Sequence, residues 1–85
     1  MASHEKLYEK MLQSKAGWGL HDLDRLYRGY GFECSEGGKH VIYIHPEFRA
    51  LRATVARHRS LPVGYIQHAL HLINELKRRK GESNG

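Results

Sequence analysis

A glycine-rich turn followed by a histidine is the part of this sequence whose residue types best fit chemistry on a phosphate. Gly37, Gly38, Lys39 and His40 follow one another directly. Glycine lets a phosphate approach the backbone closely, lysine can hold the phosphate as a point charge, and histidine exchanges a proton near neutral pH. These parts suffice for attack of a ribose 2′-hydroxyl on its own phosphodiester. A plain hairpin turn followed by a strand histidine would look the same, so both interpretations stay open at this point.

The strand that carries His40 does not by itself fix the side to which this histidine points. The sequence HVIYIH predicts a strand over residues 40–45. Strand alternation places His40 on the same side as Ile42 and Ile44, which resembles a core face. The opposite assignment, with Tyr43 inward, is also compatible with the sequence. His40 is therefore either an accessible residue or a packed histidine at the edge of the core.

The remaining histidines and the cysteine indicate no metal centre. His68 and His71 are three residues apart on a predicted helix, which is a spacing used for metal ligands, but no third ligand is evident nearby. His21 stands near a helix start and receives no role. The chain has one cysteine, Cys34, which excludes an intrachain disulfide and a zinc thiolate cluster. We expect no metal and no cofactor.

The elements that must position His40 form a small α+β domain. Apolar residues at helical spacing predict three helices, and short β-rich runs separated by glycine predict three strands. The expected order is helix 5–13, helix 20–30, strand 32–35, strand 40–45, strand 53–56 and a long helix from Pro62 onward. Hairpin-linked strands make a three-stranded antiparallel sheet, and the second and last helices supply the apolar stripes that cover one face of it. The fold class is thus a two-layer α+β domain in α-α-β-β-β-α order.

The length and the charge distribution bound the domain organisation and the kind of ligand. With 85 residues the chain forms one domain, 1–85, whose core covers about 20–76, with an N-terminal helix extension 3–14 and a polar tail 81–85. Residues 37–80 hold nine Lys and Arg against two Asp and Glu, a net charge of +7. Such a one-sided basic field indicates a polyanion ligand, although solubility alone is the plain alternative.

The composition also points to a compartment. The sequence has no apolar run long enough to span a membrane, and the charged N-terminus lacks the apolar stretch of a secretory signal. Together with the single cysteine, these features predict a cytoplasmic protein that does not engage a membrane.

Several short motifs follow one another along the chain. A leucine-containing helix, DLDRLYRGY, is followed by Gly31-Phe32-Glu33, then by Gly38-Lys39-His40, and then by a strand that ends at His45-Pro46. Val55-Ala56-Arg57-His58 comes next, and Pro62 opens the last helix. In this order the chain resembles the HicA family of toxin ribonucleases over roughly residues 20–76. Lys39 replaces the serine usual in that family, and Val41 stands where a second histidine is common.

The resemblance implies a fold similar to the double-stranded-RNA-binding domain and a function as an mRNA-cleaving toxin. It implies that His40 is the catalytic residue, the general base for the 2′-hydroxyl in a metal-independent reaction. We expect Gly38, Lys39, Arg57 and His58 to bind the RNA phosphates. The resemblance also implies a protein partner, a cognate HicB-like antitoxin.

Two other functions remain compatible with the sequence. The first is a non-catalytic RNA-binding module of the same fold, and the second is a protein-interaction subunit whose basic face docks an acidic partner. The basic run Lys77, Arg78, Arg79 and Lys80 has two interpretations as well. It complements the dipole at a helix C-terminus, which we favour, or it makes additional contacts with RNA or with an acidic antitoxin surface.

Overall fold

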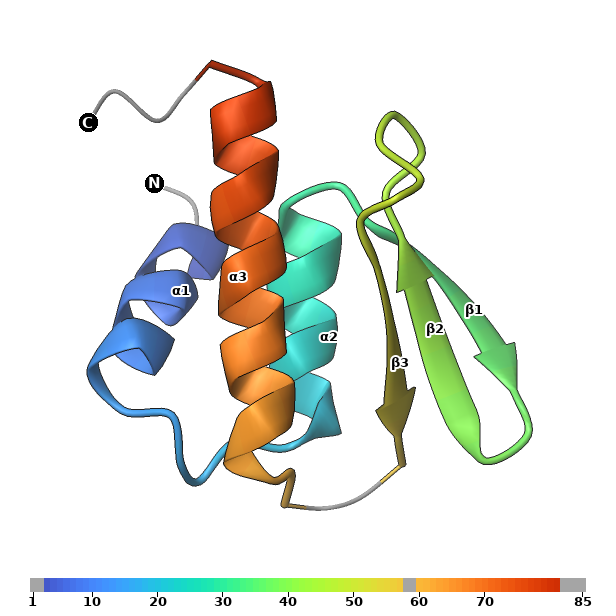
Figure 1. Ribbon diagram of the computed structural model, residues 1–85. Coiled ribbons are helices and arrows are strands. Elements are labelled where there is room, and N and C mark those ends of the chain that lie inside the picture. The colour runs from blue at the N-terminus through green and yellow to red at the C-terminus, as the bar shows by residue number, and fades with distance from the viewer. Residues whose placement is uncertain (1–2, 58–59, 82–85) are drawn as a thin grey trace.

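The computed structural model describes residues 3–57 and 60–81. Its six elements confirm the expected α+β order, with all three helices on one side of the sheet (Figure 1). The elements are α1 (Ser3–Gln13), α2 (Leu20–Gly29), β1 (Glu33–Gly37), β2 (His40–Ile44), β3 (Arg52–Ala56) and α3 (Val63–Arg79).

The sheet is an antiparallel meander in which β2 lies between β1 and β3. Gly37 pairs with His40, so the β1–β2 hairpin has a two-residue loop, Gly38-Lys39. Gly38 has a φ of 56°, and no residue other than glycine has a positive φ in the part of the chain that the structure describes. Glycine at the first central position and an ordinary φ at the second are typical of a type II′ hairpin turn. The turn is therefore shorter than the four residues expected from the sequence.

Alternation along β2 decides which residues enter the core. Val41 and Tyr43 are buried, whereas Ile42 and Ile44 are only partly covered on the outer face. The Tyr43 ring stacks on Tyr27 of α2, with ring centroids 4.6 Å apart. This aromatic contact binds the central strand to the helix layer and selects the second of the two orientations that the sequence allowed.

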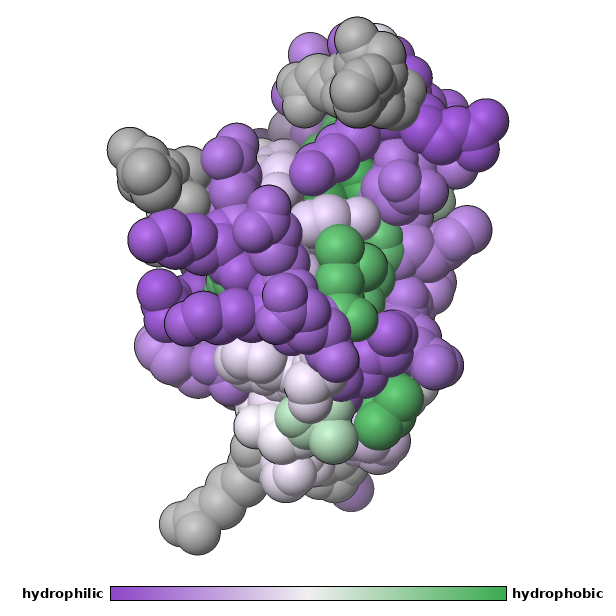
Figure 2. All heavy atoms as spheres, turned by 90° about the vertical axis from the view of Figure 1, so that its left-hand side faces the viewer, coloured by the Kyte–Doolittle hydropathy of each residue, from purple (hydrophilic) through white to green (hydrophobic). Residues whose placement is uncertain are grey.

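The helix layer buries its apolar stripes between α2, α3 and the sheet. Leu23 and Leu26 of α2 and Ile66 and Ile73 of α3 have no exposed surface. α1 adds Leu7 and Met11 to this core and packs on α2 and α3. The outward face of this layer is mostly hydrophilic, and its few apolar side chains stand apart from one another (Figure 2).

Candidate active site

His40 lies at the first position of β2 and is exposed on the outer face of the sheet. Because Tyr43 faces the helices, parity turns His40 to the opposite side. None of the three helices in the described part of the chain covers that side (Figure 1). Of the two alternatives left open by the sequence, the packed core-edge histidine is thus wrong for this residue, and the accessible histidine is the one observed.

The register of the sheet brings Arg57 to the glycine-rich turn. His40 pairs with Ala56 across β2 and β3, so the next residue of the chain leaves the sheet beside Lys39. The Arg57 backbone N–H donates to the Lys39 carbonyl oxygen at 3.4 Å, and its Nε donates to the Gly38 carbonyl oxygen at 3.0 Å. The turn and the end of β3 are thereby held against each other.

An open cavity with a volume of about 460 Å³ lies at this junction. It is lined by Gly38, Lys39, His40, Ala56 and Arg57. Three of the four residues expected to bind phosphate, Gly38, Lys39 and Arg57, therefore share one cavity with the expected catalytic histidine. The fourth, His58, lies outside the described residues. We refer to this cavity below as the His40 cleft.

The two cations of the His40 cleft differ in how they are engaged. Arg57 Nη2 lies 3.3 Å from Glu36 Oε1, an ion pair in which both side chains are substantially exposed. Lys39 is exposed and forms no ion pair with any residue in the described ranges 3–57 and 60–81. Because exposed pairs are weak and screened by salt, Arg57 keeps guanidinium N–H groups for an incoming anion while its position is fixed by the backbone of Gly38.

A second groove continues from Arg57 along the helix side of the sheet. Its volume is about 290 Å³, and its lining includes His21, Arg28, Glu36 and Arg57. No function was expected for His21 from the sequence, but the first turn of α2 places it, exposed, in the groove that adjoins the His40 cleft. Arg57 lines both the groove and the His40 cleft.

Both helices that pack on the sheet point their N-termini to the end of the molecule at which the β1–β2 turn lies (Figure 1). A helix N-terminus carries the equivalent of roughly half a positive charge. At this end the Leu61 backbone N–H donates to the Trp18 carbonyl oxygen at 2.8 Å, which ties the segment before α3 to the loop before α2. The turn, the end of β3 and the two helix starts therefore lie at one end of the molecule, where the Gly19 N–H at the start of α2 already donates to Asp22 Oδ2 at 3.0 Å.

The basic run Lys77–Lys80 lies at the opposite end of the molecule (Figure 1). α3 has 17 residues, which separates its two ends by about 25 Å. Arg78 and Arg79 each lie 3.5 Å from a carboxylate oxygen of Glu75, and Lys80 lies 3.9 Å from Glu47. Lys77 Nζ lies 4.4 Å from the centre of the Tyr8 ring. The structure thus does not bring these residues to the His40 cleft.

His45 is a buried histidine with a structural role. It is 2 % exposed, and its Nδ1 accepts a hydrogen bond from the Glu47 backbone N–H at 3.1 Å. Burial lowers the pKa of His45, and the nearby positive charge of Lys80 lowers it further. An unprotonated Nδ1 is what the bond from Glu47 requires, so His45 is held neutral beside Phe32.

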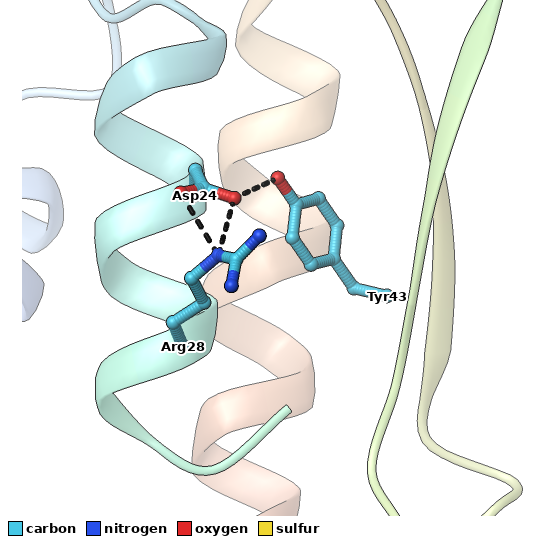
Figure 3. A network of polar contacts seen from close by, with 3 residues as sticks. All are labelled: Asp24, Arg28 and Tyr43. Carbon is cyan, nitrogen blue, oxygen red and sulfur yellow. Dashed lines mark hydrogen bonds and ion pairs between the residues drawn. The ribbon is translucent and has the colours of Figure 1, made fainter. Parts of the chain in front are cut away.

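A polar network joins α2 to the middle of the sheet (Figure 3). The Tyr43 hydroxyl donates to Asp24 Oδ1 at 2.8 Å, and Arg28 Nε lies 2.9 and 3.0 Å from the two oxygens of the same carboxylate. The four-residue spacing of Asp24 and Arg28 on a predicted helix is the pattern of a helical ion pair and could have been found in the sequence. The hydrogen bond from Tyr43, 19 residues away in the sequence, could not have been found in this way.

The described residues form neither a metal-binding cluster nor a helix that could cross a membrane. Within the ranges 3–57 and 60–81, no group of three or more His, Cys, Asp or Glu residues could hold a metal ion. His68 Nε2 lies 3.4 Å from the Arg52 carbonyl oxygen. In the same part of the chain no helix is both long and apolar enough to cross a membrane.

The chain matches no family model, no curated protein and no solved structure.

Proposed function

We propose that this protein is an RNA-cleaving toxin of the HicA type, an mRNA interferase that acts in the cytoplasm. The observation that carries the proposal is the convergence of Lys39, His40 and Arg57 on one open cleft, although Arg57 lies far from the other two in the sequence. A proton-transfer group beside two cations is the minimum that cleavage of RNA by its own 2′-hydroxyl requires.

In the proposed reaction His40 accepts the proton of a ribose 2′-hydroxyl. The 2′-oxygen then attacks the adjacent phosphorus, the bond to the 5′-oxygen breaks, and the departing 5′-oxygen takes a proton from water. The hydroxide that remains takes the proton from His40, which restores the free base. Lys39 and Arg57 stabilise the charge that develops on the phosphate oxygens. The products are a 2′,3′-cyclic phosphate and a 5′-hydroxyl. One positioned acid–base group contributes about 10²–10⁴ in rate, so a slow nuclease is expected.

The surroundings of His40 support binding of RNA by its backbone. Gly37 and Gly38 have open space where a side chain would stand, so nothing on the turn blocks a phosphate. The adjoining groove with His21 and Arg28 offers a path for the neighbouring nucleotide. Binding of this kind relies on shape and phosphate contact rather than on reading of bases.

The proposal includes a protein partner that restrains the enzyme. An unrestrained ribonuclease would harm its host, and the resemblance to HicA proteins suggests a HicB-like antitoxin. Expression of this chain alone is expected to slow growth, and co-expression of the neighbouring gene is expected to relieve that effect.

The test is cleavage of a labelled RNA by wild-type protein and by His40→Ala. The matched control is His71→Ala, which removes another exposed histidine, on α3. We expect His40→Ala to lose at least 10²-fold in rate at an unchanged melting temperature, and His71→Ala to cut normally. A chelator should have no effect, a 2′-deoxy substitution at the scissile nucleotide should block cleavage there, and the product should carry the cyclic phosphate.

Three results would contradict the proposal. Cleavage at the wild-type rate by folded His40→Ala would show that this histidine is not catalytic. Wild-type protein that binds RNA without cutting it, and whose expression is harmless, would be the non-catalytic module. If the wild-type protein neither binds nor cuts RNA, the remaining alternative is a protein-interaction subunit.

A further inference from the structure

β3 is an edge strand with backbone groups available for pairing. The His45 N–H donates to the Leu51 carbonyl oxygen and the Arg57 N–H to that of Lys39, so the odd-numbered residues from 51 to 57 pair with β2. Alternation then turns the N–H and C=O groups of Arg52, Thr54 and Ala56 to the free edge. Within the described residues, the one side-chain contact on this edge is that of His68 with the Arg52 carbonyl oxygen, at 3.4 Å.

A groove runs beside this free edge. It has a volume of about 400 Å³ and separates β3 from the first turns of α3. Its lining is mainly apolar, from Ala53 on β3 to Pro62 and Tyr65 at the start of α3. Gly64 also lines it, and the space where a side chain would stand there is open. The groove could therefore accommodate apolar side chains of an added strand on the inner side of the sheet.

The charges around the edge select the kind of segment that fits. Among the described residues, the lining of the groove includes Arg52 and His68 and contains no Asp or Glu. Arg52 is exposed on the outer face of β3 and also lines the groove. A second copy of this chain would bring the same positive charges to the edge, whereas an acidic segment would be complementary to it.

We propose that β3 accepts an extended acidic segment of a partner protein as a fourth strand of the sheet. The backbone of the segment pairs with Thr54 and Ala56, its apolar side chains enter the groove beside Tyr65, and its carboxylates lie along the outer face near Arg52. Addition of a strand to an exposed sheet edge is an established mode of peptide recognition, in which pairing gives affinity and alternate pockets give specificity.

The position of the edge connects this docking site to the His40 cleft. Ala53 and Thr54 line the groove, and Ala56 and Arg57, on the same strand, line the cleft. β3 has five residues, about 17 Å of extended chain. An added strand that covers β3 therefore ends at Arg57, where a carboxylate takes the place of an RNA phosphate. This last step rests on the proposed function, whereas the docking itself does not.

The docking is tested with a synthetic peptide in the absence of RNA. The probe is acetyl-Glu-Val-Glu-Tyr-Glu-Val-Glu-amide, and the readout is amide hydrogen exchange of Thr54 and Ala56 by NMR. These two amides are expected to exchange fast in the free protein and at least tenfold slower with the peptide. The control peptides carry Lys in place of Glu, or N-methyl groups on the backbone amides that face β3, and neither should protect these amides.

Two substitutions in the protein also test the docking of the peptide on β3. Thr54→Pro removes an edge N–H that points to solvent, a position at which strands tolerate proline, and Arg52→Glu reverses the charge beside the groove. Both should weaken peptide binding at least tenfold. Arg25→Glu, an equal charge change on the exposed side of α2, should not.

The outcomes separate the docking from the proposed function. Peptide binding without protection of Thr54 and Ala56, or equal binding by Arg52→Glu and Arg25→Glu, would overturn the proposal, as would protection by a single-stranded RNA but not by the peptide. Protection that grows with protein concentration alone would indicate pairing of two copies and would also overturn it. Docking that leaves RNA binding unchanged would confirm the edge site and refute its link to the His40 cleft.

Discussion

The hydroxyl of Tyr43 offers a quantitative test of how the sheet is held to the helix layer. Tyr43→Phe removes the donor to Asp24 and leaves the ring, which keeps its stack on Tyr27 at 4.6 Å. Burial raises the pKa of Tyr43 well above its usual range, and the bond to the Asp24 carboxylate raises it further, so the hydroxyl is a donor at every pH of interest. The substitution therefore isolates one hydrogen bond to a charged acceptor.

The size of the effect follows from the exposure of the acceptor. A hydrogen bond to a charged group contributes about 1.5–3 kcal/mol. The Asp24 side chain is 31 % exposed and keeps its pair with Arg28, so water can replace the lost donor in part and the lower value, about 1.5 kcal/mol, applies. For a domain of this size such a loss lowers the melting temperature by roughly 6–12 °C.

The assay is urea and thermal unfolding of wild type, Tyr43→Phe and Arg28→Gln at pH 7. Arg28→Gln is the control because it breaks the other contact of Asp24. That contact is a surface pair with the Arg28 side chain 57 % exposed, and it should contribute only about 0.3–0.5 kcal/mol. Equal losses in the two variants, or a loss below about 0.5 kcal/mol in Tyr43→Phe, would refute the view that the buried hydroxyl is the stronger link.

Three further results are expected. RNA binding should weaken with salt at a log–log slope near −3, if about four phosphates are neutralised at roughly −0.7 each, and a flat response in filter binding would contradict a polyanion ligand. Because the pKa of His45 is lowered by burial while the unfolded chain takes up a proton near pH 6.5, the free energy of unfolding should fall as the pH drops below about 6.5, and urea titrations should show a smaller fall for His45→Gln. Charge reversal of Arg78 and Arg79 should leave RNA affinity nearly unchanged, because both lie on Glu75 at the end of α3 remote from the cleft, and a tenfold loss at an unchanged melting temperature would show that they contact RNA.

The element order could be predicted because it depends on local patterns. Helical spacing of apolar residues marks α2 and α3, and Gly31, with a φ of 93°, ends α2 where a left-handed residue is needed. The orientation of β2 could not be predicted in the same way, because apolar residues occupy both of its faces. The stack of Tyr43 on Tyr27 decides it, and that contact between two elements has no local signature.

The candidate site was predictable in part for the same reason. Gly38, Lys39 and His40 are neighbours in the sequence and were expected to act together. That Arg57 joins them depends on the pairing of His40 with Ala56, which a register shift of one residue would have changed. The place of His21 beside the cleft depends on how α2 crosses the sheet, which the sequence does not state.

The two ends of the molecule differ in which of their charges are already paired. Residues 37–80 hold nine cations, and four of them, Lys77–Lys80, lie at the C-terminal end of α3. There Glu75 and Glu47 pair with three of the four cations. The negative end of the α3 dipole further reduces the positive potential of these cations. At the other end Lys39 has no carboxylate partner in the described ranges, and Glu36 pairs with Arg57 at 3.3 Å. The start of α3, without an acidic residue in its first turn, adds positive potential, while Asp22 offsets that of α2. A phosphate that approaches Arg78, Arg79 or Lys80 meets a cation already paired with a carboxylate, whereas Lys39 at the turn has no such partner in the described ranges. Lys39, beside His40, is therefore the cation at which a phosphate of the proposed RNA ligand would bind without displacing a carboxylate.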